Sequence, residues 1–143
     1  MKSAKHEVMG YLLRRSPIAS LVGGRIFPGA SPQVTEYPRV EVELEGREQS
    51  HHLAAAAAAV EAGFEINIYD ESEDRVSVVA RLVREAMNGE PGNFGELVVD
   101  HVRLDGETES VLAPNDGSDD PVYNVAQDWT VWYRENAPSF PAE

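Results

Sequence analysis

The chain has 143 residues, a length that suits one domain, and its 25 acidic residues against 12 lysines and arginines give a formal net charge of −13. Such a chain repels phosphate, so sequence-specific binding of nucleic acid is disfavoured. The absence of cysteine excludes disulfides, thiolate metal sites and thiol catalysis. No segment approaches the roughly 18 apolar residues of a membrane span, and the charged first residues are unlike a signal peptide.

Helical structure is predicted at the start of the chain. Apolar residues recur at helical spacing over residues 4–15, and Pro17 ends or restarts that helix. A second short turn follows at residues 18–22 and stops at two glycines. Residues 25–38 contain three prolines, so we predict an extended coil there.

Two strands are predicted next. Residues 39–45 alternate apolar and charged side chains, which indicates a strand with one buried and one wet face. The same alternation is present at residues 63–69. Residues 46–62 lie between them and include six alanines at 54–59, a run too short to form a stable helix without packing. We interpret residues 46–62 as a long, partly mobile hairpin tip.

The strongest helix signal covers residues 72–87, where Ser72 is a plausible N-cap and an apolar stripe follows at helical spacing. A weaker strand signal spans residues 96–104. Residues 105–121 carry acidic residues and no basic one, and we interpret them as an acidic loop. A last strand is predicted for residues 122–134.

The order of these elements predicts an α+β fold in a single domain, residues 1–135, with a mainly antiparallel β-sheet and two helices packed on one face. Residues 136–143, with two prolines, are expected to form a flexible C-terminal tail. Trp129 is expected in the core, whereas Trp132 faces the other way and either anchors an interface or packs under a helix. The alternation and the helix stripe together predict a core of Val40, Val42, Leu44, Phe64, Ile66, Ile68, Val79, Val83, Trp129 and Val131.

Patterns that would support catalysis or metal binding are weak. His51 and His52 are adjacent and would point to opposite faces of a strand, so a shared metal site is not expected. Residues 115–120 (NDGSDD) lack the glycine and the closing glutamate of an EF-hand loop and are interpreted as a solvated turn. We find no nucleophile elbow and no phosphate-binding glycine pattern. We therefore expect no catalytic residue, no cofactor and no metal, and predict that the protein is not an enzyme.

The elements, taken in order, resemble the tail-terminator (tail-completion) proteins of long-tailed bacteriophages, including the lambda-like ones. The resemblance starts at residues 24–27 (GRIF) before the proline-rich connector and continues with residues 37–46 (YPRVEVELEG). It includes residues 64–69 (FEINIY), followed directly by the amphipathic helix, and closes with residues 128–133 (DWTVWY). The resemblance spans residues 4–133, with the alanine run and the acidic loop as departures from the pattern.

The resemblance implies a structural virion protein at the head-proximal end of the tail, assembled in the host cytoplasm. Such proteins form a homo-hexameric ring that caps the tail tube, stops its polymerisation and offers an interface for head–tail joining. The implied partners are the tail tube protein, a head-completion or connector protein, and genomic DNA that passes through the lumen without specific binding; no membrane is involved. The residues that we expect at the interfaces or the lumen are Glu41, Glu43, Glu45, Arg47, His51, His52, Asp116, Asp119 and Asp120.

Two other interpretations remain. The chain could be another head–tail connector or completion protein, or, less readily, a small binding domain encoded by a host. The acidic composition also has two interpretations: it favours solubility, or it provides a surface that a polyanion passes without being held.

Overall fold

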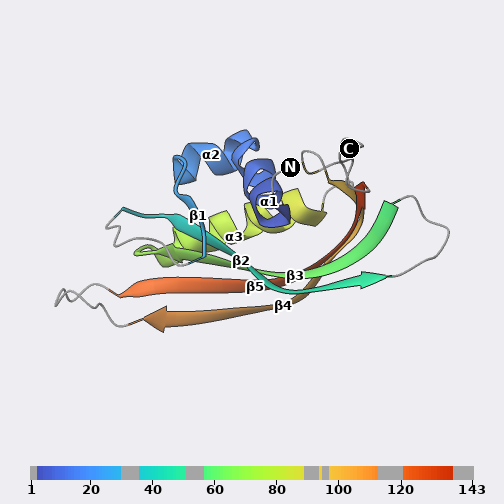
Figure 1. The fold of residues 1–143 in the computed structure, drawn as a ribbon. Coiled ribbons are helices and arrows are strands. Elements are labelled where there is room, and N and C mark those ends of the chain that lie inside the picture. The colour runs from blue at the N-terminus through green and yellow to red at the C-terminus, as the bar shows by residue number, and fades with distance from the viewer. Residues whose placement is uncertain are drawn as a thin grey trace.

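The computed structural model describes residues 3–29, 36–50, 57–88, 94, 97–112 and 121–136. Three helices pack on one face of a five-stranded sheet, so the predicted single-domain α+β fold is confirmed with three helices in place of two (Figure 1). The helices are α1 (Ala4–Leu13), α2 (Ser16–Val22) and α3 (Glu73–Asn88). The strands are β1 (Ile26–Pro28), β2 (Arg39–Ser50), β3 (Ala57–Asp70), β4 (Val98–Leu112) and β5 (Val122–Asn136). No described helix is both long and apolar enough to span a membrane.

The strand order in the sheet is β1-β2-β3-β5-β4, with β1 parallel to β2 and the other neighbours antiparallel. The prediction of coil throughout residues 25–38 is wrong at β1, where Ile26 pairs with Val40 and Pro28 with Val42. A three-residue strand that includes a proline has no alternation to detect. Its existence depends on pairing with β2, which the local sequence does not encode.

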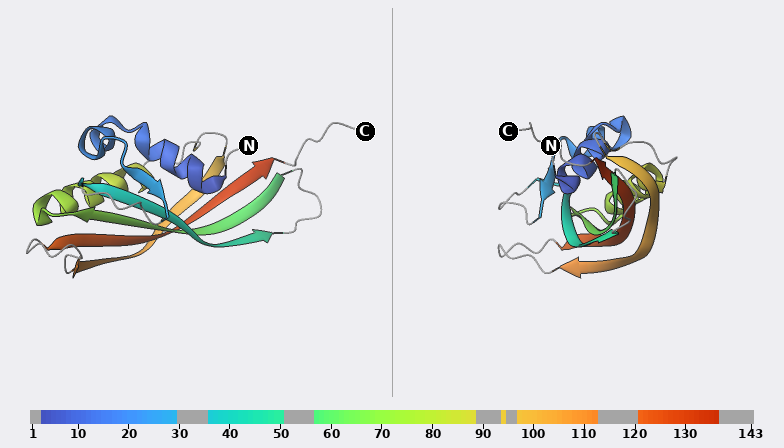
Figure 2. Two further views of the ribbon diagram at one scale, coloured as in Figure 1. Left: turned by 60° about the vertical axis from the view of Figure 1, so that its left-hand side comes forward. Right: turned by 45° about the vertical axis from the view of Figure 1, so that its right-hand side comes forward.

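The long strands are longer than predicted. Within the expected hairpin tip, β2 continues to Ser50 and β3 begins at Ala57, and residues 51–56 lie outside the described residues. Residues 57–59 are extended because β5 pairs with all three of them and β2 pairs with Ala59, which overrides the helical preference of alanine. The β2–β3 hairpin extends beyond the helices at one end of the sheet (Figure 2).

The expected acidic loop is also corrected, because β4 continues to Leu112 and pairs with β5 along its length. Residues 113–120 lie outside the described residues. The register of β4 shifts at Val99/His101 and at Leu104/Gly106, and these irregularities break the strict alternation that would have identified the strand. At the other end, β5 includes Asn136, the first residue of the expected tail; residues 137–143 are not described.

The core lies between the sheet and the helices, where α1 contacts β1 and β2 while α3 contacts β3, β4 and β5. Nine of the ten predicted core residues are buried there: Val40, Val42, Phe64, Ile66, Ile68, Val79, Val83, Trp129 and Val131. Leu44 is the exception, with 43% of its surface exposed. Gly29 N–H donates to the Val42 carbonyl at 2.9 Å where β1 ends, so no described strand flanks β2 on that side at Leu44.

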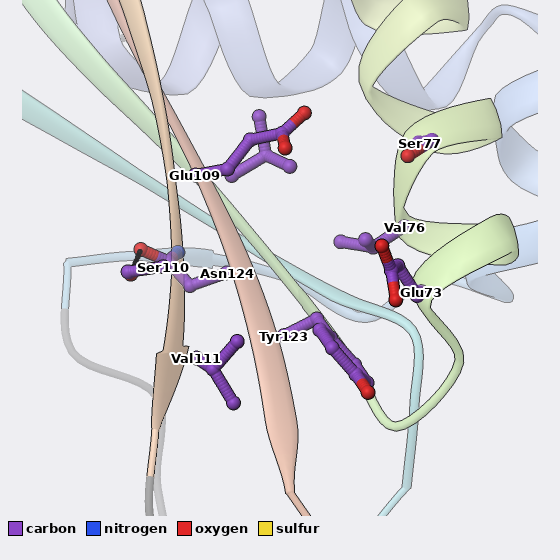
Figure 3. A pocket seen from close by; sticks show the side chains of 9 residues that line it. Glu73, Val76, Ser77, Glu109, Ser110, Val111, Tyr123 and Asn124 are labelled. Atoms are coloured by element: carbon purple, nitrogen blue, oxygen red, sulfur yellow. Dashed lines mark hydrogen bonds between the residues drawn. The ribbon is translucent and has the colours of Figure 1, made fainter.

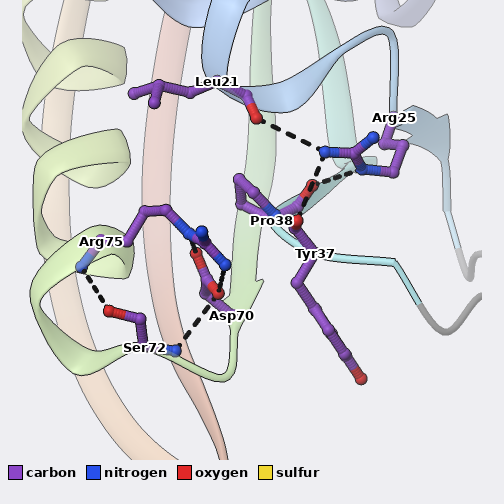
Figure 4. A network of polar contacts seen from close by, with 7 residues as sticks. All are labelled: Leu21, Arg25, Tyr37, Pro38, Asp70, Ser72 and Arg75. Carbon is purple, nitrogen blue, oxygen red and sulfur yellow. Dashed lines mark hydrogen bonds and ion pairs between the residues drawn. The ribbon is translucent and has the colours of Figure 1, made fainter.

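A buried carboxylate fixes the turn from β3 into α3. Asp70 is fully buried and accepts hydrogen bonds from Ser72 N–H at 3.2 Å and from Nε and Nη2 of Arg75 (Figure 4). Ser72 Oγ accepts from Arg75 N–H at 3.2 Å, which confirms Ser72 as the N-cap. The turn therefore has its own charge-assisted hydrogen bonds, and these set where the helix begins.

A second polar cluster holds β1 beside β2. The Arg25 guanidinium donates to the carbonyl of Pro38 at 2.9 Å and to those of Leu21 and Tyr37 at 3.4 Å (Figure 4). The Tyr37–Pro38 peptide bond is cis. One arginine thus joins the end of α2 to the start of β2, two segments separated by the proline-rich connector.

A third polar cluster joins α3 to β4 and β5. Gln127 is fully buried; its amide donates to the Ala80 carbonyl at 3.0 Å and to Glu107 at 2.8 Å, and its oxygen accepts from Trp129 Nε1 at 3.0 Å. Arg84 of α3 donates to both carboxylate oxygens of Glu107 at 2.7 and 2.9 Å. Because every polar group has a partner, the cluster orients α3 on the sheet without leaving an unpaired buried group.

Candidate interface on the open face of the sheet

The face of the sheet opposite the helices, here called the open face, carries much of the charge of the chain. On β2, Glu41 and Glu43 alternate with the buried Val40 and Val42 and therefore point away from the helices. Glu45 follows at the register shift between Leu44 and Gly46, and its Cβ approaches Gly63 of the open face. The outward orientation predicted for these three glutamates is confirmed.

Two further carboxylates from neighbouring strands lie beside Glu45. Glu65 of β3 pairs with Glu43 on one side and with Asp128 of β5 on the other. Carboxylate oxygens of Glu45, Glu65 and Asp128 all lie within 4.8 Å of one another, and we call these three residues the acidic cluster. Like charges this close repel one another, so the cluster is a local concentration of unfavourable electrostatic energy in the isolated chain.

The surroundings of Glu45 raise the pKa of its carboxyl group. Partial burial raises the pKa of Glu45 above its ordinary value, and the hydrogen bond with Asp128 and the negative charges of Asp128, Glu65 and Glu43 raise it further. The folded chain therefore binds a proton at this position more tightly than a solvated glutamate does.

The acidic cluster has the ligand chemistry of a hard cation, but it is incomplete as a metal site. It offers carboxylate oxygens, which calcium and magnesium prefer, yet a calcium ion takes about six to eight oxygens. Exposed acidic groups commonly gather without a metal. The arrangement is explained by the alternation of three adjacent strands, which places one carboxylate from each on the same face.

At the β4 edge the open face changes character. The Trp132 ring lies 5.3 Å from the His101 ring and 5.0 Å from the Arg103 guanidinium, measured to the ring centroid. Arg103 also pairs with Asp105 at 2.6 Å, and hydrogen bonds from Thr130 and then Arg103 lower the pKa of Asp105. Trp132 thus lies on the face without helices, so the interpretation that it packs under a helix is wrong; a role as an interface anchor stays a prediction.

The remaining cation near this edge is also paired. Arg134 donates to Asp100 at 2.9 Å and 3.1 Å, and this hydrogen bonding lowers the pKa of Asp100. Each arginine of the β4 edge therefore has a carboxylate of its own. The negative charge of the acidic cluster, in contrast, is not balanced by these arginines.

Of the nine predicted interface residues, the structure brings together Glu41, Glu43 and Glu45. Arg47 lies beyond the register shift, in register with the buried Ala62 and therefore on the helix side of β2. The predicted positions outside the described residues are His51, His52, Asp116, Asp119 and Asp120. Sequence reasoning missed Glu65 and Asp128, although each lies next to buried residues of its own strand, and that parity alone places it on the open face.

Comparison with known proteins identifies the fold. No protein-family model and no curated protein matches the sequence. A chain in the solved structure of the virion of the native gene transfer agent particle is similar to this chain, with a TM-score of 0.67. The match covers 93% of this chain and 96% of the other at 12% sequence identity. At that identity the likeness establishes a shared fold over nearly the whole of both chains.

Proposed function

We propose that this chain is a structural virion protein that acts as a tail terminator. The observation that carries the proposal is the shared fold with a chain of a gene transfer agent virion over 93% of this chain and 96% of the other. A match over nearly the whole of both chains favours the same kind of use for the same fold. The order of elements that resembles the tail-terminator family supports the finer assignment.

In this role the chain forms a hexameric ring at the head-proximal end of the tail. The ring caps the tail tube, stops its polymerisation and provides the interface for head–tail joining. Its partners are further copies of itself, the tail tube protein and a head-completion or connector protein. The work depends on shape, symmetry and charge and requires no catalysis and no cofactor.

The open face is the best candidate for the wall of the ring's channel. Six copies at −13 carry a charge of 6 × −13 = −78 before any counter-ion is bound. An acidic wall repels DNA over roughly the 10 Å screening length at about 0.1 M salt, so the DNA slides through without binding. The acidic cluster and the neighbouring Glu41 and Glu43 provide such a surface on strands that the core holds rigidly.

The ring is tested by measuring the mass of this protein in isolated tails. The expected stoichiometry is six copies per tail or a multiple of six, and electron microscopy of the same tails should show a ring at the head-proximal end. Any other stoichiometry contradicts the proposal. Monomers in dilute solution would not, because the tube can act as the template for assembly.

The channel wall is tested separately with the double variant Glu43→Lys and Glu65→Lys. Tails should assemble normally while DNA ejection slows, because lysines on the wall attract phosphate. The matched control is Asp74→Lys and Glu85→Lys, which makes the same change of charge on exposed positions of α3. Equal ejection rates in the two variants would remove the open face from the channel.

The fold match supports a second virion role equally well, that of another head–tail connector or completion protein. The two roles separate by the part of the particle with which the protein copurifies. Recovery with tails that lack heads favours the terminator, and recovery with heads that lack tails favours the connector. Absence from both would favour the host-encoded binding domain.

A further inference from the structure

A groove of about 270 Å³ lies where the first half of α3 faces the end of β4 and the start of β5 (Figure 3). Its apolar lining includes Val76, Val111 and Tyr123. Glu73 enters from the helix and Glu109 from β4, on either side of the open space. Val111 is 62% exposed, which makes it the most exposed of the large apolar side chains in the described part of the chain.

The groove lacks a cation. Among the residues that the structure describes, neither Glu73 nor Glu109 has an ion-pair partner, and no basic residue lines the groove. Two carboxylates beside an apolar wall have the chemistry that an arginine or lysine fits, because the stem of such a side chain packs on apolar surface while its charged end meets the carboxylates.

The same helix and strand contain a carboxylate that is already paired with an arginine. Glu107 lies on β4 two residues before Glu109, on the same face, and receives the Arg84 guanidinium of α3 at 2.7 and 2.9 Å. Ser77 lies seven residues before Arg84, two helical turns away on the same side of α3, and lines the groove. On this side of α3 the groove is therefore lined by a serine and not by a cation.

Within the described part of the chain, one arginine lacks a partner of its own. Of the ten arginines, which are the 12 basic residues less Lys2 and Lys5, nine have an ion pair, a hydrogen bond or another electrostatic contact. The side chain of Arg14 has none within the described residues, and it is exposed at the end of α1. Its neighbour Leu13 is 36% exposed. An exposed cation beside an exposed leucine complements a groove that has two carboxylates beside an exposed valine.

We propose that the groove binds Arg14 of a second copy of this chain, with the guanidinium between Glu73 and Glu109 and Leu13 covering Val111. The contact repeats the Arg84–Glu107 arrangement between two molecules. It joins two different surfaces, so it is head-to-tail and leads from each copy to the next, as a closed ring requires. Only this last step, closure into a ring, rests on the proposed function.

The absence of native cysteine makes the contact testable by crosslinking. The single variants Leu13→Cys and Val111→Cys are purified separately, mixed at high concentration and treated with a short bis-maleimide. The expected product is a mixed dimer that neither variant yields alone. The control mixture replaces Leu13→Cys by Lys5→Cys, on the same helix. A yield of mixed dimer no higher than in the control overturns the proposal.

A charge exchange tests the role of Arg14 itself. Adding Arg14→Glu to the Leu13→Cys variant should lower the yield of mixed dimer about tenfold, as expected for loss of an interface charge pair. Adding Glu109→Arg to the Val111→Cys partner should restore it. Lys5→Glu, the matched change of charge on α1, should leave the yield unchanged; equal losses for Lys5→Glu and Arg14→Glu would reduce the effect to net charge and overturn the proposal.

The outcome separates the contact from the ring. If tails still contain six copies with Arg14→Glu in place and normal yield, the ring stands and the Arg14 contact fails. If the mixed dimer forms as expected but tails hold another number of copies, the contact stands and the hexamer fails.

Discussion

The two faces of the sheet differ in how they deal with charge. On the helix side, the buried Asp70 and Gln127 have their partners within the chain, and most of the buried residues around them are apolar. On the open face, Glu45, Glu65 and Asp128 repel one another at short range. The same strands therefore stabilise the fold with one face and lose some stability on the other. We propose that the charge of this surface serves a contact outside the chain.

The largest expected difference in the free energy of unfolding is between two adjacent positions of β3 that lie on opposite faces of the sheet. Ile66→Ala should lower the free energy of unfolding by about 2–5 kcal/mol, because Ile66 is fully buried and the truncation leaves a cavity. Glu65→Ala, one residue earlier on the open face, should change it by less than about 0.5 kcal/mol or increase it. Urea denaturation of both variants gives the comparison. Similar losses in the two would contradict the assignment of faces.

A smaller loss of stability is expected when the hydrogen bonds of Asp70 at the start of α3 are removed. Asp70→Ala removes the acceptor of the Ser72 and Arg75 hydrogen bonds and should lower the free energy of unfolding by about 1.5–3 kcal/mol. Glu71→Ala, at the exposed next residue, serves as the control and should stay within about 0.5 kcal/mol of the wild type. If both variants melt at the wild-type temperature, the cluster does not stabilise the turn.

For the acidic cluster we predict the opposite effect: replacing one of its carboxylates should increase the stability of the fold. Because the pKa of Glu45 is raised in the folded chain, its contribution to stability is complete below the ordinary value of 4.5 and is lost as pH rises through the folded pKa. Glu45→Gln should therefore exceed the wild type in stability near pH 7, by less than about 1 kcal/mol because the site is exposed, and the gain should shrink towards pH 4.5.

Asp105 provides the matched control for the sign. Its pKa is lowered, so its contribution is present above the ordinary value of 3.8 and is lost as pH falls through the folded pKa. Asp105→Asn should therefore destabilise the chain near neutral pH. Denaturation curves of Glu45→Gln and Asp105→Asn near pH 7 and near pH 4.5 test this difference. If the two variants change stability in the same direction near pH 7, the electrostatic difference between the acidic cluster and the β4 edge is contradicted.

The smallest effect is expected at Leu44. Leu44→Ser should cost less than about 1 kcal/mol, because the side chain is already 43% exposed where β1 no longer flanks β2. Val42→Ser, two residues earlier and fully buried, should cost more. A larger loss at Leu44 in the chemical denaturation of the two variants would mean that it packs against part of the chain outside the described residues.

The sequence predicted elements where a local signal was strong. Residues such as Val40, Ile66 and Trp129 fall on the helix side because strict alternation leaves no other arrangement of the strand. β1 and the second half of β4 went undetected because β1 is held by pairing with β2 and by Arg25, and β4 is irregular at Leu104/Gly106. Only knowledge of strand order could show that Glu65 and Asp128 lie beside Glu45.

The position of β5 in the sheet has a consequence for synthesis. β5 is made after every other strand of this sheet, yet it lies between β3 and β4 and supplies Trp129, Val131 and Tyr133 to the core. Until β5 leaves the ribosome, β3 and β4 have no strand to join them, and the core under α3 is open. Pairs such as Phe64 with Trp129 connect distant parts of the chain, so the sheet closes late and as a unit. A chain interrupted before β5 would lack a complete sheet, so only a fully translated copy can present the surfaces that assembly requires.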